Sequence, residues 1–143
     1  MKVSSIIEHK GDGVIAISSQ ANLKAAANLM LNHGIAALVV MKGGKAVGLV
    51  SERDIVEALS RHGNAAGLVR VQEILSSRFV VVSPDETIKR AMSIMTNERI
   101  RHLPVIDKGE PVGIVSLGDM VKYRLEELEL ETNVLRDVYI AAH

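Results

Sequence analysis

The amino-acid sequence predicts an α/β (α+β) protein built from two copies of a βαββα unit and a C-terminal helix. The first observation is an internal repeat, because residues 17–54 align without a gap on residues 82–119 and about a third of the aligned positions are identical. The second is the form of the repeat: two short apolar runs flank a polar corner and then meet Ser-x-x-Asp. That pattern is typical of a β-hairpin that leads directly into a capped helix.

The composition indicates a compact protein with an aliphatic core. The chain has 143 residues, which suits one compact unit, and 48% of them are apolar, which excludes a disordered chain. Phe79, Tyr123 and Tyr139 are the only aromatic residues, so the stacking platforms that bind single-stranded nucleic acid are missing. Basic and acidic residues number 17 each, so no overall basic field favours DNA or anionic lipid.

Further absences narrow the class of protein. The chain has no cysteine, which excludes disulfides, thiolate catalysis and cysteine-based metal sites. No apolar run reaches about 18 residues, and the N-terminus lacks the apolar core of a signal peptide. The histidines at positions 9, 33, 62 and 143 show no metal-ligand spacing. We therefore expect a cytoplasmic protein that has no metal site and no membrane or nucleic-acid partner.

The first unit follows from its apolar periodicity and its turn residues. Asn22 is a plausible N-cap for a helix that Gly34 ends, and a Lys-Gly-Gly-Lys turn joins the two hairpin strands. The expected elements are a lead-in at 3–7, a turn at 10–13, a strand at 14–17, a helix at 23–32, strands at 36–41 and 46–50, and a helix at 54–60.

The second unit repeats this order after a linker at residues 61–67. The segment Ser83-Pro84-Asp85-Glu86 has the cap and the acidic first turn that a helix start prefers. The expected elements are a lead-in at 71–75, a strand at 79–82, a helix at 87–97, strands at 103–106 and 112–115, and a long helix from residue 118. We place the first unit at residues 1–67, the second at 68–127 and a helical extension at 128–143.

The terminal helix is apolar on one side well beyond the second unit. The stripe has spacings of three and four residues and consists of Val121, Leu125, Leu128, Thr132, Leu135 and Val138. A row of glutamates gives the helix a polar face. This stripe has no obvious partner within one chain, so it favours association with another molecule.

The two strand-to-helix corners carry the candidate chemistry. The Asp119 carboxylate can accept hydrogen bonds from two hydroxyls, each worth roughly 1.5–3 kcal/mol. Ser116 lies at a helix start, where backbone N–H groups favour an anion. Arg101 offers a planar donor fork for phosphate, His102 adds a titratable donor, and Arg53 could supply positive charge to the other corner. Helix capping alone for the Ser and Asp residues, a surface ion pair for the arginines and a packed histidine remain open alternatives.

These residues resemble the CBS domain, the cystathionine-β-synthase-type repeat that occurs in pairs. The resemblance covers all but the terminal helix beyond about residue 128 and indicates a stand-alone pair, or Bateman module, with no catalytic or transporter domain. It is carried by the element order and by these motifs: Gly34-Ile35, Arg99-Ile100, Leu103-Pro104-Val105, Gly48, Gly113, Ser51-x-x-Asp54 and Ser116-x-x-Asp119.

The resemblance implies two repeats that pack through their sheets around a pseudo-two-fold axis and leave two clefts for AMP, ADP, ATP, NAD or S-adenosylmethionine. The aspartate would accept the ribose hydroxyls, the serine and basic side chains would hold phosphate, and backbone near the first strand would read adenine. Ala36 and Ala37 stand where Arg101 and His102 stand in the second repeat, which argues against equal occupancy. The expected ligand-binding residues are Ser116, Asp119, Arg101, His102, Pro104, Val82, Ser51, Arg53, Asp54, Ile17, Ile35 and Ala37.

Three functions compete on this evidence. The first is a regulatory module that senses an adenosine-type ligand and acts through the geometry of a homodimer or through a protein partner. The second is a scaffold whose clefts stay empty and whose helices mediate dimerisation and partner binding. The third is an enzyme, for which His102 is the only histidine near a serine corner and no nucleophile, phosphate-loop or zinc motif is present. We expect no catalytic residue and no required cofactor.

Overall fold

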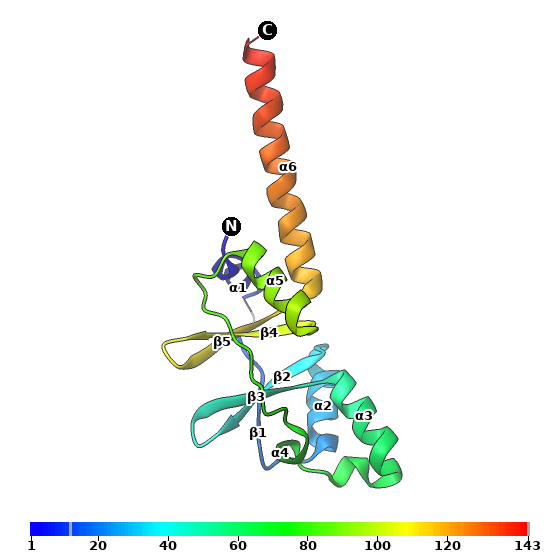
Figure 1. Ribbon diagram of the computed structural model, residues 1–143. Helices are drawn as coiled ribbons and strands as arrows, with labels where there is room; N and C mark the ends of the chain where they lie inside the picture. Colours follow the sequence, from blue (N-terminus) through cyan, green and yellow to red (C-terminus); the bar gives the residue numbers. More distant parts are fainter. Residues whose placement is uncertain (12, 143) are drawn as a thin grey trace.

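A computed structural model describes residues 1–11 and 13–142, and Figure 1 shows their arrangement. Asp12, in the turn expected at 10–13, and His143 lie outside the described residues. The elements, in order, are α1 (Val3–Lys10), β1 (Ala16–Ser18), α2 (Leu23–His33), β2 (Ala37–Lys42), β3 (Lys45–Ser51), α3 (Glu52–His62), the 3₁₀ helix η1 (Gly63–Leu68), α4 (Val71–Ile74), α5 (Ile88–Glu98), β4 (His102–Asp107), β5 (Glu110–Ser116) and α6 (Leu117–Ala142).

Two small sheets form the centre of the molecule. In the first, β1 runs parallel to β2, and β2 pairs antiparallel with β3. The second contains the hairpin of β4 and β5. The two hairpins share their register, since Val39 faces Leu49 and Pro104 faces Ile114, 65 positions later in each strand. The internal repeat in the sequence is therefore a repeat of structure.

The strand expected at 79–82 does not form, and two prolines explain why. Only Val82 pairs, in a single parallel bridge with Val105. In the first repeat, β1 is held by the bond from Val39 N–H to the Ile15 carbonyl, 3.3 Å, and from Ser19 N–H to the Met41 carbonyl, 2.9 Å. Pro104 and Pro84 occupy the positions of Val39 and Ser19 and have no N–H to donate.

The helix starts agree with the expected caps in all but one case. Asn22 accepts from Ala25 N–H at 2.9 Å, and Gly34 ends α2 in the left-handed conformation. The expectation that Ser83 caps the next helix is wrong: α5 begins at Ile88, and its N-cap is Thr87, which accepts from Arg90 N–H at 3.1 Å. The segment 83–86 is a turn and an extended stretch that joins the Val82 bridge to that cap.

The two lead-in segments are helices, α1 and α4, and each packs in the core of the unit that it does not belong to in sequence. Val3 and Ile6 of α1 are buried in the core of the second unit, and Val71 of α4 is buried in the core of the first. Glycines in the hairpins make room for the crossing, because a Cβ on Gly113 would overlap the side chain of Ile7. Each unit is thus completed by the helix with which the other unit's sequence begins.

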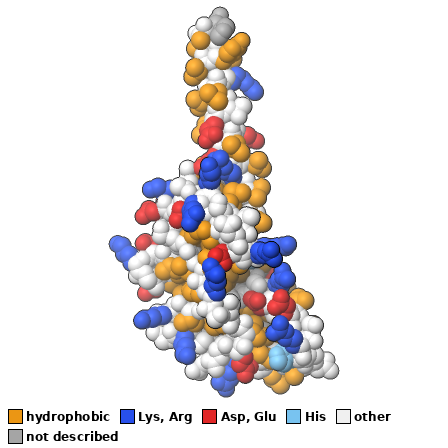
Figure 2. All heavy atoms as spheres, in the orientation of Figure 1, with side chains coloured by type: hydrophobic (Ala, Val, Ile, Leu, Met, Phe, Trp, Pro, Cys, Tyr) orange, Lys and Arg blue, Asp and Glu red, His pale blue; other side chains and the backbone are white. Residues whose placement is uncertain are grey.

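Helix α6 begins on the body and then leaves it. Met120 and Tyr123 are buried against the second unit, and from there the helix projects away as a single rod (Figure 1). Figure 2 shows hydrophobic side chains along that rod, whereas basic and acidic side chains are intermixed on the body. Among the described residues, no helix has the length and apolar character needed to cross a membrane.

Candidate functional site

The two Ser-x-x-Asp corners have the same local structure. Ser51 N–H donates to Asp54 Oδ2 at 2.8 Å, and Ser116 N–H donates to Asp119 Oδ2 at 2.9 Å. In return each serine Oγ accepts from the aspartate N–H, which closes a reciprocal cap at the start of α3 and of α6. The capping role is therefore real, and it holds both carboxylates in fixed positions next to the clefts.

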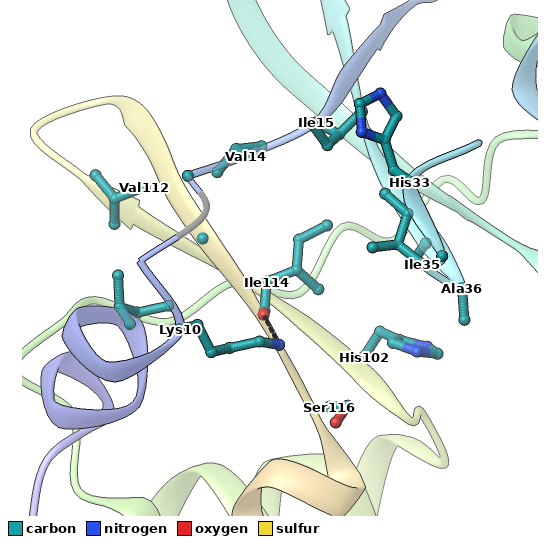
Figure 3. Close-up of a pocket in the computed structure, with 15 residues that line it drawn as sticks. Lys10, Val14, Ile15, His33, Ile35, Ala36, His102, Val112, Ile114 and Ser116 are labelled. Atoms are coloured by element: carbon teal, nitrogen blue, oxygen red, sulfur yellow. Dashed lines mark hydrogen bonds between the residues drawn. The ribbon is translucent and has the colours of Figure 1, made fainter. Parts of the chain in front are cut away.

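One cleft, of about 720 Å³, lies between the corner at Ser116 and the first unit. The first unit lines this cleft with the segment just before β1 and with the residues that lead into β2. The rest of the lining comes from β5 and from α1, which packs on the second unit. Figure 3 shows Lys10 reaching from the end of α1 across β5, with its Nζ 3.3 Å from the Ile114 carbonyl. The lining includes Lys10, Val14, Ile15, His33, Ile35, Ala36, Ala37, His102, Ile114 and Ser116.

Lys10 also forms an ion pair with the carboxylate behind that cleft. Its Nζ lies 2.8 Å from Asp119 Oδ2, and the Asp119 side chain is 23% exposed. Burial works to raise the pKa of Asp119, but the hydrogen bonds from Lys10 and Ser116 and the lysine charge outweigh it and hold the pKa below its ordinary value. This carboxylate is therefore ionised and already has a cation beside it.

The other cleft, of about 730 Å³, lies between the corner at Ser51 and the second unit. It is rich in arginine, with Arg53, Arg78, Arg99 and Arg101 along its wall. Arg53 bonds Glu57 at 3.3 Å and Arg78 bonds Glu98 at 2.5 Å, whereas within the described chain Arg99 and Arg101 take part in no ion pair. The other lining residues are Ala36, Gly48, Leu49, Ser51, Glu52, Asp54, Glu57, Ile74, Ser76, Phe79, Val80, Ile100, His102 and Pro104.

The corners and the basic side chains are paired across the repeats. We expected Arg101 beside Asp119, because both belong to the second repeat. The structure instead places Arg101 in the cleft of Ser51 and Asp54 and Ala37 in the cleft of Ser116, whereas Ala36 lines both. His102 lines both clefts. Each cleft thus combines the corner of one repeat with the strand entry of the other.

The remaining expected residues fall into two groups, those that line a cleft and those that do not. Ile35 and Ala37 line the cleft at Ser116, and Pro104 lines the cleft at Ser51. Ile17 and Val82, by contrast, are buried in the two cores and line neither cleft. The residues that do line the clefts near the first strands lie two and three positions earlier, and they are Val14, Ile15, Phe79 and Val80.

Three basic residues of the clefts were not expected: Lys10, Arg78 and Arg99. Lys10 and Arg78 are equivalent, since each follows by three positions the residue that packs on a hairpin glycine, Ile7 or Leu75. That equal spacing was a signal in the sequence. Arg99 occupies the left-handed position at the end of α5, with φ of 56°, where the first repeat has Gly34.

His102 is the titratable group between the clefts. Burial lowers its pKa from the ordinary value of 6.5; Glu52 and Asp119 oppose that change, and Lys10 and Arg101 add to it. Its imidazole is therefore neutral at pH 7 and offers one donor and one acceptor. No group of three or more metal-ligating side chains is found among the residues that the structure describes.

Comparison with known proteins gives the family. The CBS domain model matches the chain twice, over residues 4–61 and 71–126. The CBS domain-containing protein YhcV of Bacillus subtilis is 31% identical, over 82% of this chain and 84% of its own length. The mitochondrial CBS domain-containing protein CBSX3 of Arabidopsis thaliana is also 31% identical, over 87% of this chain but only 65% of its own length.

Solved structures agree in fold and in extent. A CBS-domain containing protein from Agrobacterium tumefaciens superposes with a TM-score of 0.81 at 33% identity, covering 87% of this chain and 99% of that one. A putative signal-transduction protein with CBS domains from Burkholderia ambifaria has a TM-score of 0.80 at 31% identity, covering 88% and 95%. Because the family model matches most of the chain, and in two copies, the chain belongs to the CBS-domain family, with two repeats and a C-terminal helix.

Proposed function

We propose that the protein is a non-catalytic regulatory module that binds adenosine-type ligands, such as AMP, ATP, NAD or S-adenosylmethionine, in its two clefts. The observation that carries the proposal is that each cleft joins a fixed Ser-x-x-Asp corner to basic side chains of the opposite repeat. The family supports it, because CBS-domain proteins are regulatory modules that commonly bind adenosine ligands.

The cleft at Asp54 has the groups that a phosphorylated ligand needs. The carboxylate of Asp54 accepts from ribose hydroxyls, and the N-terminal end of α3 and the Ser51 hydroxyl lie beside it. Arg99 and Arg101 need not break an ion pair to bind phosphate oxygens in a forked geometry. Phe79 supplies an apolar surface for the base. This cleft is the tighter site for a nucleotide that carries phosphate.

The cleft at Ser116 has fewer cations, and its carboxylate, Asp119, lies beside Ser116 and Lys10 rather than in the lining itself. Lys10 is bonded to Asp119 before any ligand arrives, so ribose hydroxyls compete with an ammonium group for the same oxygens. A phosphorylated ligand offers that ammonium a second anion, and the lysine then turns from the carboxylate toward the phosphate. Val14, Ile15 and Ile35 give the adenine an apolar surround. This site is weaker, and it depends on the ligand having phosphate.

Regulation follows from where the clefts lie. Each is lined by both units, so a ligand connects the two units and changes the free energy of their relative arrangement. His102 lines both clefts, so a ligand in either cleft changes the surroundings of its imidazole. The change is read by the geometry of a homodimer or by a protein partner.

The test is a ligand screen on the purified chain by thermal shift and calorimetry, with AMP, ATP, NAD and S-adenosylmethionine. We expect at least one ligand to bind with a dissociation constant well below 1 mM and to raise the unfolding temperature, since binding to the native state stabilises it. Asp54→Asn should weaken that binding, with Asp137→Asn, the same change at a carboxylate of α6 that lines neither cleft, as a control. Absence of binding by all four ligands would favour the alternative function, a scaffold that works with empty clefts.

A further inference from the structure

The projecting helix carries a seam with the spacing of a coiled coil. Its members alternate at intervals of four and three residues, and they are Val121, Leu125, Leu128, Thr132, Leu135, Tyr139 and Ala142. Its large apolar members are all exposed, with relative exposures that run from 42% for Val121 and Leu128 to 71% for Leu135. A repeat of 3.5 residues sustained over three heptads indicates supercoiling with another helix rather than packing on a globular surface.

The seam and the residues that pack on the body lie on different faces of the helix. Met120 and Tyr123 make the contact with the second unit. At about 100° per residue, the seam lies roughly 130° around the helix axis from those two side chains. Figure 1 shows the helix leaving the body, and Figure 2 shows hydrophobic side chains, with some charged ones, along its length. A second helix can therefore lie along the seam without meeting the body of its own chain.

We propose that the seam binds the same seam of a second copy of this chain, in parallel orientation, as a two-stranded coiled coil. The charges beside the seam favour this partner and this direction. With Leu125 and Leu128 as heptad positions a and d, the flanking e positions are Lys122, Glu129 and Arg136, and the charged g positions are Arg124 and Glu131. In a parallel pair each g residue faces the e residue five positions later in the other helix.

Both charged pairs formed in this way are attractive. Glu131 meets Arg136 of the second copy, and Arg124, which also bonds Glu127 of its own chain at 2.9 Å, lies opposite Glu129 of the second copy, each twice by symmetry. An antiparallel pair sets e against e and g against g, and two of its registers overlap six of the seven seam members. One brings Glu129 against Glu129 and Glu131 against Glu131, which is repulsive, and the other forms only the Glu129–Arg136 pairs, fewer than the parallel arrangement.

Burial of the seam would not leave its central polar residue, Thr132, without a hydrogen bond. Thr132 is its only member with a hydroxyl on an aliphatic side chain, and its Oγ1 donates to the Leu128 carbonyl at 2.9 Å, so the hydroxyl keeps a partner when water is removed. A groove of about 410 Å³ runs along this face between the side chains. Its lining consists of Leu125, Leu128, Glu129, Thr132, Asn133 and Arg136. Such a groove is the kind of hole into which a knob residue of a second helix fits.

Analytical ultracentrifugation with a matched pair of variants tests the contact. Leu135→Lys places a charge in the seam, whereas Leu130→Lys makes the same change at a residue that is similarly exposed, 61% against 71%, but off the seam. We expect the wild type and Leu130→Lys to be dimers and Leu135→Lys to dissociate with a constant at least tenfold higher. Equal association of the two variants, or a monomeric or tetrameric wild type, would overturn the proposal.

Cysteine cross-linking tests the direction. The described residues include no cysteine, so one can be introduced alone. Ala142→Cys lies in the seam at the far end of the helix, and Ala141→Cys is its neighbour off the seam. In a parallel pair the two thiols introduced by Ala142→Cys meet, and mild oxidation gives a covalent dimer much faster than for Ala141→Cys. Equal rates would contradict the parallel seam.

Ligand binding separates this proposal from the proposed function. The seam lies outside both clefts, so Leu135→Lys should still bind nucleotide, with an affinity changed only by the coupling between ligand and dimer. Loss of the dimer with ligand binding retained therefore concerns the seam alone. Absence of ligand binding in a dimeric wild type would instead concern the clefts alone.

Discussion

Lys10 Nζ lies 2.8 Å from Asp119 Oδ2, whereas Asp54, the equivalent carboxylate of the first repeat, bonds only to Ser51 among the residues that the structure describes. Lys10 comes from α1, a helix that precedes the first repeat in the sequence but packs in the second. The two clefts are therefore alike in backbone and different in charge. Without ligand, the carboxylate of Asp119 at one cleft is already paired with Lys10. In the other cleft, Arg99 and Arg101 take part in no ion pair with the described residues.

The ion pair predicts opposite effects on two ligands. In Lys10→Met the ammonium is lost, so Asp119 is free for ribose hydroxyls but a phosphate has no partner there. Adenosine should bind the Asp119 cleft at least as tightly as in wild type, and AMP should bind it about tenfold more weakly, the effect of losing one charge-assisted hydrogen bond. Calorimetry in an Asp54→Asn background isolates this cleft. A parallel loss of adenosine and AMP affinity would show that Lys10 does not discriminate phosphate.

The crossed pairing predicts which variants act on the same site. Arg101→Met should weaken AMP binding about tenfold at the cleft that contains Asp54, because a guanidinium–phosphate bond is lost. The loss should persist in an Asp119→Asn background and vanish in an Asp54→Asn background. Calorimetric titration of the single and double variants gives this comparison. The reverse dependence would place Arg101 with Asp119, as the order of the sequence alone suggests.

Replacement of Arg99 by glycine should stabilise the fold and weaken ligand binding. It has φ of 56°, a left-handed conformation that costs a non-glycine residue about 1–2 kcal/mol, and Gly34 holds the equivalent position in the first repeat. Arg99→Gly should raise the free energy of unfolding by about 1 kcal/mol and weaken AMP binding. Arg99→Ala should weaken binding without that gain. Urea unfolding and calorimetry measure the two quantities, and a gain from both variants would remove backbone conformation as the cause.

His102 predicts a loss of stability on mild acidification. Its pKa is lowered in the folded protein, chiefly by burial, from 6.5. As the pH falls from 6.5 toward that lowered value, the unfolded chain binds a proton that the folded protein does not, so the free energy of unfolding falls. Asp119, whose pKa is also lowered, contributes a further loss only as the pH falls through 3.8 and below. Urea unfolding between about pH 7.5 and pH 5 should show a smaller slope in His102→Gln, and an unchanged slope would assign the effect to other groups.

The elements that the sequence predicted well are those with a local signal. The repeat period locates both hairpins, and the Ser-x-x-Asp corners cap α3 and α6 as their spacing predicts. The missing strand near Val82 also had a visible cause, because Pro84 and Pro104 each remove a donor that the first repeat uses. Analogy with the first repeat therefore predicts a full strand where only the Val82 bridge forms.

The arrangement of the clefts could not be predicted in the same way. Which repeat supplies the cations to which corner depends on how the two units pack, and neither Arg101 nor Asp119 carries that information locally. The packing of α1 and α4 on the opposite units likewise depends on tertiary contacts. Those contacts include Ile7 against Gly113 and Leu75 against Gly48. Lys10 and Arg78 enter the clefts as a consequence of that packing.

The most direct measurement is calorimetric titration of ATP into wild type and into the Asp54→Asn and Asp119→Asn variants. Asparagine keeps an oxygen for the helix cap but has no charge and only one acceptor for the ribose. We predict that Asp54→Asn removes the tighter event, that Asp119→Asn removes the weaker one, and that the double variant, still folded by circular dichroism, binds no ATP. Wild-type affinity in the folded double variant would contradict the assignment of the two carboxylates to the ligand sites.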